Sequence, residues 1–318
     1  MRKKKAFIIG VTGQDGSYLS KLLIKKKFTV YGYTRSIVSK NLKNLIKLNI
    51  LSKIKIKKYN HNDPKVVLND IKKIKPDQIY YFSGQSSVGK SFLKPLETYK
   101  SNVDLLFLIL ESIRINKFYK IKFYNSSSTD SFGQTKKIFK NEKDLFFPHS
   151  PYGNAKSFSF WITKYYRENY GLNSKSGILS NHESPLRNKN FVLKRIIDFV
   201  KKRKSNSILK LGNISIYRDW GWAPEYVEAI YKINNSKSKK DYIVGTGKIV
   251  SLKYIVNKIF KLANINNKFY KVNNSNLLRP NEIKKIGTDP TQIYKDLKWR
   301  SKLSIDQIIK KLLLDELY

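Results

Sequence analysis

Residues 6–19 read AFIIGVTGQDGSYL, and this stretch decides the fold. Its four leading residues are typical of a short buried strand, and glycines follow at positions 10, 13 and 16. Glycines between a strand and a helix permit a tight turn and let a pyrophosphate approach the amide groups at the helix N-terminus. The stretch therefore predicts a dinucleotide site built from Gly10, Thr12, Gly13, Gln14, Asp15 and Gly16.

An alternation of strand and helix patterns continues outward from this turn. Strand patterns occupy residues 29–33, 54–59, 78–82, 121–124 and 176–179, and helical patterns occupy 64–73, 95–116 and a stretch from 151. This alternation implies an α/β protein with a doubly wound parallel sheet, whose ligands bind at the carboxyl ends of the strands. We predict a Rossmann domain over 1–177, to which 213–245 return, and a smaller C-terminal α/β lobe formed by 178–212 and 246–318.

The residues after the second strand pattern bear on the choice of cofactor. An acidic side chain there would hold the adenosine ribose of NAD, whereas Arg35 and Ser36 suit the 2′-phosphate of NADP. We therefore predict NADP. The alternative is an incidental surface arginine.

A tyrosine and a lysine stand four residues apart in SPYGNAK, residues 150–156. Tyr152 and Lys156 would lie one helical turn apart on the same face. A neighbouring ammonium can lower the pKa of a phenol, normally near 10, so that tyrosine becomes a usable base. In a chain rich in both residues the pair alone also fits a solvated helix face, and the dinucleotide turn at the N-terminus favours the catalytic interpretation. The Ser/Thr/Asp cluster at 125–133 is expected to face the same cleft as that turn.

The composition excludes several classes of protein. The 318 residues can bury a large core in one or two domains, and the chain has no cysteine for disulfides or thiolate metal sites. No apolar run approaches the ~18 residues of a membrane span, and no signal peptide precedes the first strand pattern. We expect a cytoplasmic protein without a metal site or membrane insertion.

The net charge of +41 is spread along the whole chain, without a basic tail. Such a charge suits nucleic acid, and a nucleic-acid-binding or scaffold protein with a decayed active site is one alternative. We favour a solvated surface and expect no specific nucleic-acid partner.

Six motifs together resemble those of the GDP-mannose 4,6-dehydratase family, within the extended short-chain dehydrogenases/reductases. They are GVTGQDGSYL (10–19), GQSSV (84–88), SPYGNAK (150–156), GILSNHESPL (177–186), RDWGW (218–222) and LRPNEI (278–283). GQD and NHESP are the most specific, and the resemblance runs nearly end to end. It implies NADP as cofactor, a GDP-sugar substrate bound by the smaller lobe, and the removal of water.

The resemblance also implies the roles of the catalytic residues. Tyr152, assisted by Lys156, would take the proton of the hexose 4-hydroxyl while C4 is oxidised, and a carboxylate would take the C5 proton before water leaves from C6. The positions that match the family for these steps are Ser128 and Asp130. Asp130 departs from the usual Glu and retracts the carboxylate by roughly 1 Å, a misplacement that can be costly.

The resemblance implies binding residues in the same way. The residues expected to bind the cofactor are Asn60, His61, Ser83, Gly84, Gln85, His182 and Arg187. The residues expected to bind the substrate are Ser86, Asn181, Lys194, Leu211, Gly212, Arg218, Arg279 and Glu282. Asn60-His61 stands where an Asp followed by an apolar residue often meets the adenine. Loop capping is the alternative for Asn181 and Glu282, and we expect Trp220 and Trp222 to pack rather than bind ligand.

We predict an NADP-dependent lyase that converts GDP-mannose to GDP-4-keto-6-deoxymannose, as a homodimer or homotetramer. The nearest alternative is the same reaction on another GDP-sugar, such as a GDP-heptose. A nucleotide-sugar 4-reductase or epimerase is the next, and it would need Tyr152 but no carboxylate at 130.

Overall fold

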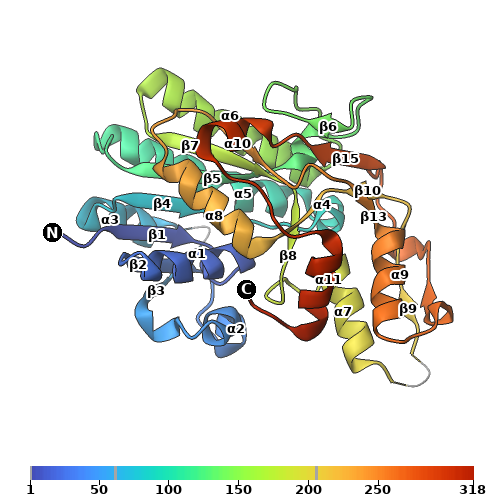
Figure 1. Ribbon diagram of the computed structural model, residues 1–318. Coiled ribbons are helices and arrows are strands. Elements are labelled where there is room, and N and C mark those ends of the chain that lie inside the picture. Colours follow the sequence, from blue (N-terminus) through green and yellow to red (C-terminus); the bar gives the residue numbers. More distant parts are fainter. Residues whose placement is uncertain (1, 61–62, 205–206) are drawn as a thin grey trace.

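A parallel sheet of seven strands forms the centre of the computed structural model, which describes residues 2–60, 63–204 and 207–318 (Figure 1). The strand order is β12-β7-β5-β4-β1-β2-β3, and every neighbouring pair is parallel. The strands are β1 (Lys5–Ile9), β2 (Thr29–Thr34), β3 (Ile54–Lys58), β4 (Gln78–Tyr81), β5 (Lys122–Ser128), β7 (Ser174–Leu179) and β12 (Tyr242–Val244). The predicted doubly wound sheet is confirmed.

Helices cover both faces of this sheet because successive strand residues point to opposite sides. Ala6 and Ile8 of β1 join one core, with α1 (Gln14–Lys25), α2 (Ser39–Lys47), α8 (Ala223–Asn235) and α10 (Thr291–Leu297). Phe7 and Ile9 join the other, with α3 (Lys65–Ile74), α5 (Pro95–Ile115) and α6 (Pro151–Tyr170). The short helix α4 (Val88–Leu93) lies between β4 and α5 in the chain.

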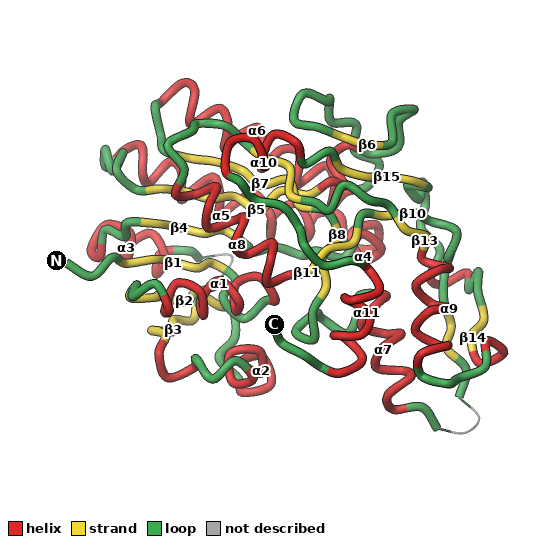
Figure 2. Tube along the Cα trace, in the orientation of Figure 1, coloured by secondary structure: helices red, strands yellow, loops and turns green. Residues whose placement is uncertain are grey.

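A smaller lobe beside the carboxyl ends of the strands has its own core (Figure 2). Its helices are α7 (Val192–Lys202), α9 (Leu252–Leu262) and α11 (Ile305–Leu314). Its four-stranded sheet runs β13 (Val250–Ser251), β10 (Tyr217–Arg218), β15 (Lys285–Thr288) and β6 (Phe139–Lys140), and a two-stranded sheet pairs β14 (Tyr270–Lys271) with β9 (Leu209–Lys210). Trp220 and Trp222 are buried in this core, so the prediction that they pack is confirmed.

Two segments differ from the sequence-based expectation. Strand β5 extends through Ser128, because Asn125 to Ser128 pair with β7 instead of forming a loop. The NHE and WGW motifs, to which the sequence analysis assigned no element, form the parallel pair β8 (Asn181–Glu183) and β11 (Trp220–Trp222). Four 3-10 turns complete the described elements: η1 (Leu51–Lys53), η2 (Thr129–Phe132), η3 (Asn267–Phe269) and η4 (Ser275–Leu277).

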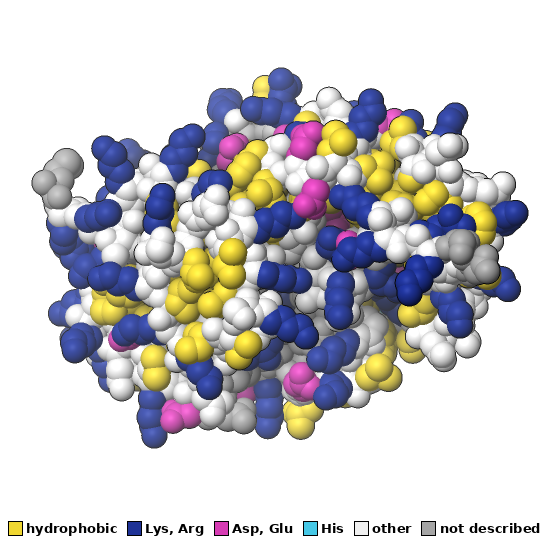
Figure 3. Space-filling model, turned by 90° about the horizontal axis from the view of Figure 1, so that it is seen from below, with side chains coloured by type: hydrophobic (Ala, Val, Ile, Leu, Met, Phe, Trp, Pro, Cys, Tyr) yellow, Lys and Arg dark blue, Asp and Glu magenta, His cyan; other side chains and the backbone are white. Residues whose placement is uncertain are grey.

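The basic side chains are dispersed over the surface. Figure 3 shows lysines and arginines across the whole viewed face, with apolar and acidic side chains between them. Among the helices that the structure describes, none combines the length and the apolar character that a membrane crossing requires.

Candidate active site

The glycine-rich turn after β1 needs glycine for steric reasons. Gly10 has a φ of 92°, and a Cβ there would lie 3.0 Å from the backbone carbon of Phe82. A Cβ on Gly16 would lie 2.4 Å from the Gly10 oxygen, so α1 could not approach the strand. Gly13 is the N-cap of α1 and brings no side chain to its first-turn amides. This end of α1 thus retains uncapped donors suited to an anion.

Side chains from the first turn of α1 are tied to β8. The Asp15 carboxylate lies 3.0 and 3.1 Å from His182 Nε2. Gln14 Nε2 donates to the His182 carbonyl, and Ser184 Oγ donates to Gln14 Oε1. Burial alone would raise the pKa of Asp15, but the charge and hydrogen bond of His182, with Arg187, outweigh it and lower the pKa to about 2.

The end of β2 presents the residues predicted to choose the cofactor. Arg35 is exposed and forms no ion pair within the described ranges, whereas Ser36 is half-buried. Thr34 Oγ1 lies 3.4 Å from Thr12 Oγ1, which ties this strand end to the glycine-rich turn. Asn60 is exposed at the end of β3, and His61 lies outside the described residues.

The loop after β4 is held by its own polar groups. Ser83 Oγ lies 2.8 Å from the hydroxyl of buried Tyr59, a residue that the sequence did not single out. Gly84 has a φ of 138°, and a Cβ there would lie 2.3 Å from Asn102 Oδ1. The Gln85 amide binds both the backbone NH and the carbonyl of Ser87, so this side chain shapes the loop. Ser86 is exposed beside it.

Helix α6 begins directly against the Ser/Thr/Asp cluster. Ser150 caps the helix by accepting from Gly153 N at 3.0 Å, and Pro151 occupies its first position. A Cβ on Gly153 would lie 2.6 Å from the Asp130 backbone oxygen, so glycine permits this approach. Ser128 Oγ accepts from Asp130 N and donates to Asp130 Oδ2, both at 3.2 Å. The structure therefore brings Ser128, Asp130 and the start of α6 together.

The electrostatics of the Tyr-Lys pair differ from the expectation. Burial, followed by the charge of Asp130, raises the pKa of Tyr152, while Ser128 and Arg187 act in the lowering direction. Lys156 Nζ donates to the Ser126 carbonyl at 2.9 Å and lies 5.9 Å from the centre of the Tyr152 ring. Burial lowers the pKa of Lys156 to about 8, partly opposed by Asp15. The net shift of the Tyr152 pKa is therefore upward, because burial outweighs the groups that lower it.

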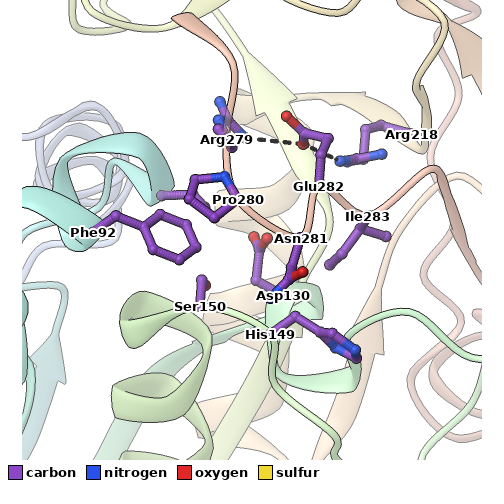
Figure 4. A pocket seen from close by; sticks show the side chains of 11 residues that line it. Phe92, Asp130, His149, Ser150, Arg218, Arg279, Pro280, Asn281, Glu282 and Ile283 are labelled. Carbon is purple, nitrogen blue, oxygen red and sulfur yellow. Dashed lines mark hydrogen bonds and ion pairs between the residues drawn. The ribbon is translucent and has the colours of Figure 1, made fainter. Parts of the chain in front are cut away.

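A small pocket lies over Asp130 (Figure 4). Glu282 Oε1 accepts from Arg218 at 3.0 Å and from Arg279 at 3.4 Å, which places two guanidinium groups on one carboxylate. Burial lowers the pKa of Arg218, opposed by Asp130 and Glu282. The pocket also contains lining residues that sequence reasoning missed, namely Val88, Phe92, His149, Ser150, Pro280, Asn281 and Ile283. Val88, Ser150, Pro280, Asn281 and Ile283 stand inside the GQSSV, SPYGNAK and LRPNEI motifs, whereas Phe92 and His149 lie just outside them.

The remaining predicted binding residues are differently placed. Lys194 is held by Asp198 of the same helix at 2.7 Å. Leu211 is fully buried in the core of the small lobe, so its side chain is not available to a base. Gly212 packs against the Leu277 backbone, where a Cβ would lie 2.6 Å from the oxygen. Asn181 is half-buried on β8, and the Arg187 guanidinium lies 3.7 Å from the centre of the Phe191 ring.

Asp219, inside the RDWGW motif, is a further residue that sequence reasoning missed. Its buried carboxylate accepts from Ser180 Oγ, from the backbone NH groups of Thr246 and Gly247, and from the hydroxyls of Thr246 and Thr288. It thereby fixes the start of β11 to the ends of β7, β12 and β15. These partners lie 27 to 69 residues away along the chain, so local patterns carry no signal of them.

Comparisons with known proteins agree on one family and one fold. The family profile described as GDP-mannose 4,6 dehydratase matches residues 7–312. A GDP-mannose 4,6 dehydratase of Dictyostelium discoideum is 33% identical, over 98% of this chain and 95% of the relative. The Homo sapiens enzyme of that name is 31% identical, over 96% and 90%. Among solved structures, a UDP-glucose 4-epimerase from Thermotoga maritima has a TM-score of 0.87 at 19% identity, covering 98% of both chains, which supports the fold alone.

Proposed function

The chain belongs to the GDP-mannose 4,6-dehydratase family, and on this premise we propose that it converts GDP-mannose to GDP-4-keto-6-deoxymannose. The observation that carries the proposal is the meeting of Ser128, Asp130 and Tyr152 at the carboxyl end of β5. Oxidation at C4 followed by loss of water across C5 and C6 needs one group for the 4-hydroxyl proton and another for the C5 proton. A buried phenol beside a carboxylate supplies both.

The proposed cofactor is NADP. The fit of a dinucleotide is supported by the close packing at Gly10 and Gly16 and by the uncapped first turn of α1. Arg35 and Ser36 would hold the 2′-phosphate, and Asn60, His61 and residues 83–85 would surround the adenosine. When bound, the nicotinamide would accept a hydride from hexose C4 and return it at C6.

The chemistry of the chain's own residues follows from their positions. Tyr152 takes the proton of the 4-hydroxyl, and the charged Lys156 and the Ser128 hydroxyl stabilise its phenolate. The resulting 4-ketone acidifies C5, and Asp130 takes that proton. The C6–O bond then breaks, and the C6 hydroxyl leaves as water with one of the two protons that Tyr152 and Asp130 have taken. The other proton goes to C5 when a hydride is added at C6.

The substrate would lie between the two lobes. Arg218 and Arg279 would hold the diphosphate, because a guanidinium fork matches phosphate oxygens, and Glu282 orients both before the substrate arrives. We further assign Asn181, Ser86 and Lys194 to the substrate, with the guanine beside the backbone of Leu211-Gly212, since the Leu211 side chain is buried. We propose a division into a cofactor domain (1–177 with 213–245) and a nucleotide-sugar lobe (178–212 and 246–318), supported by the place of β12 in the large sheet. Two elements cross it, because β6 pairs with β15 of the smaller lobe and α10 packs on the large sheet.

The decisive experiment is incubation of the protein with NADP and GDP-mannose, analysed by mass spectrometry. We expect a product lighter by one water, and Asp130→Asn should form none because an amide cannot take the C5 proton. A GDP-heptose is tested in parallel as the alternative substrate. An isomer of unchanged mass would instead support an epimerase, and unaltered GDP-mannose would contradict the proposal.

We also propose a cytoplasmic homodimer or homotetramer that associates through α5 and α6. These helices expose large apolar side chains, and Tyr99 of α5 meets Phe158 of α6 with ring centres 5.7 Å apart. On α5, acidic residues 97, 104 and 111 offset basic residues 100 and 114, so repulsion between copies is weaker here than elsewhere on this basic molecule. The exposed apolar residues of the face are Leu96, Tyr99, Phe107, Leu108, Phe158, Trp161 and Tyr165.

A further inference from the structure

Two segments that are distant in the chain line the pocket over Asp130. One is η2, which carries Asp130, and the other is residues 279–283, which carry Arg279 and Glu282. Figure 4 shows the Asp130 side chain directed toward residues 279–283. The proposed base for C5 and the proposed ligands of the diphosphate therefore face one another across a short gap.

Gln134 joins these two segments outside the pocket. It follows Gly133, the residue that ends η2, and its Oε1 accepts from the backbone NH of Lys284 at 2.7 Å. The backbone NH of Gln134 lies 3.2 Å from His149 Nδ1, next to the start of α6. Gln134 and Lys284 are 150 residues apart in the chain, so this hydrogen bond is a tertiary link.

Two further contacts make the joined segments a packed unit. Phe132 of η2 and Ile283 are buried in the same apolar cluster. Beyond Gln134, strand β6 pairs in parallel with β15, which begins directly after Lys284. Close-packed interiors compress little and transmit strain, so a displacement of residues 279–283 is passed on to η2.

We infer that Gln134 is a positioning residue, through which binding of a nucleotide diphosphate at Arg279 places the Asp130 carboxylate for removal of the C5 proton. The Arg279 side chain is 35% exposed and lies 3.4 Å from Glu282, so an incoming anion can reach it. Binding energy from a remote part of a substrate can be used in this way to orient the reacting groups. The coupling rests on the proposed GDP-sugar substrate, whereas the link between Gln134 and Lys284 does not.

Amide hydrogen exchange with GDP as the ligand tests the coupling, because GDP carries the diphosphate but no sugar to contact Asp130. The backbone NH of Phe147 reports on η2, since it donates to the Ser131 carbonyl at 3.0 Å. Saturating GDP should slow its exchange about 10-fold in the parent and less than about 3-fold in Gln134→Leu. Gln134→Glu keeps an oxygen for Lys284 and should retain the full effect. GDP that binds the parent without slowing this exchange would overturn the inference.

Exchange in the ligand-free protein tests the link alone. The Lys284 amide should exchange faster in Gln134→Leu than in the parent or in Gln134→Glu, because only the leucine variant lacks the acceptor. Equal rates in all three would refute the link. Failure of the parent to bind GDP would refute the proposed substrate class together with the coupling, and the ligand-free rates would still decide the link.

Turnover of GDP-mannose tests the positioning role. Gln134→Leu should lower kcat for the loss of water about 10-fold and leave KM and NADP affinity within about 2-fold of the parent. Gln134 is exposed, so this substitution spares the core. Lys136→Leu, also exposed and two residues further along, is the matched control and should behave as the parent does. A parent-like kcat in Gln134→Leu, or an equal loss in Gln134→Glu, would refute the positioning role.

Discussion

Tyr152 must lose a proton to act on a 4-hydroxyl, yet its surroundings favour the neutral phenol. Burial is the larger cause and the negative charge of Asp130 is the second. The two catalytic groups therefore oppose one another: the carboxylate needed at C5 makes the base at C4 weaker. Charge supplied by Lys156, whose own pKa is lowered to about 8, acts against this effect while the ammonium remains protonated.

Asp130→Asn should separate the two chemical steps. Removal of the negative charge lowers the pKa of Tyr152, so oxidation at C4 should occur at lower pH than in the parent while loss of water ceases. The measurement is the pH dependence of reduced-cofactor absorbance in a single turnover with GDP-mannose. Asp130→Glu keeps the charge and should leave the pH profile in place. A profile unchanged in Asp130→Asn would show that Asp130 does not influence Tyr152.

Arg35→Ala should abolish the preference for NADP. Charge-assisted hydrogen bonds to the 2′-phosphate are worth about 1.5–3 kcal/mol, or roughly 10- to 150-fold in affinity. Titration of the cofactor-free variant should show that loss for NADP and little change for NAD, which has no 2′-phosphate. Equal losses for both dinucleotides would contradict the assigned role of Arg35.

At the scale of elements, local patterns predict the large sheet well. Strands β1 and β4 contain short apolar runs and β3 alternates isoleucine with lysine, and the motifs at the carboxyl ends of the sheet meet because the strands are parallel. The short strands β6, β8, β10, β11 and β15 could not be predicted, because two to four residues show no periodicity and their partners lie far away in the chain. The hydrogen bonds of Asp219 and of the two ring nitrogens of His182 could not be predicted for the same reason.

The close contact between α6 and η2 predicts that a methyl group added at Gly153 destabilises the protein. In Gly153→Ala the new Cβ would meet the Asp130 backbone oxygen at 2.6 Å, so α6 or η2 must move. We expect a loss of about 1–3 kcal/mol in the free energy of unfolding, measured with denaturant. The turnover number should fall more than NADP affinity does, because Asp130 is displaced.

Gly89→Ala in α4 is the matched control. The nearest atom to its Cβ is Arg279 Nε at 3.9 Å, so the methyl group fits, and stability should rise by up to about 1 kcal/mol. Equal stability of the two variants would contradict the close contact at Gly153.

At the scale of the whole molecule, the exposed apolar side chains of α5 and α6 contrast with the high positive charge of the chain. A net charge of +41 opposes self-association of most faces. The α5–α6 face is different, because the acidic residues of α5 offset its basic ones and large side chains such as Trp161 are exposed there. A second copy can therefore pack on this face at a lower electrostatic cost than on a uniformly basic surface.

Sedimentation equilibrium should give a mass of two or four times the 37.2 kDa chain. Phe158→Lys with Trp161→Lys places two cations on one face of α6 and should shift the protein toward the single-chain mass. Since both side chains are partly exposed, near-ultraviolet circular dichroism should show that the fold survives. Leu314→Lys on α11, exposed and outside the α5–α6 face, should leave the mass of the assembly unchanged. A parent protein of single-chain mass, or an assembly that tolerates the double substitution, would rule out association through α5 and α6.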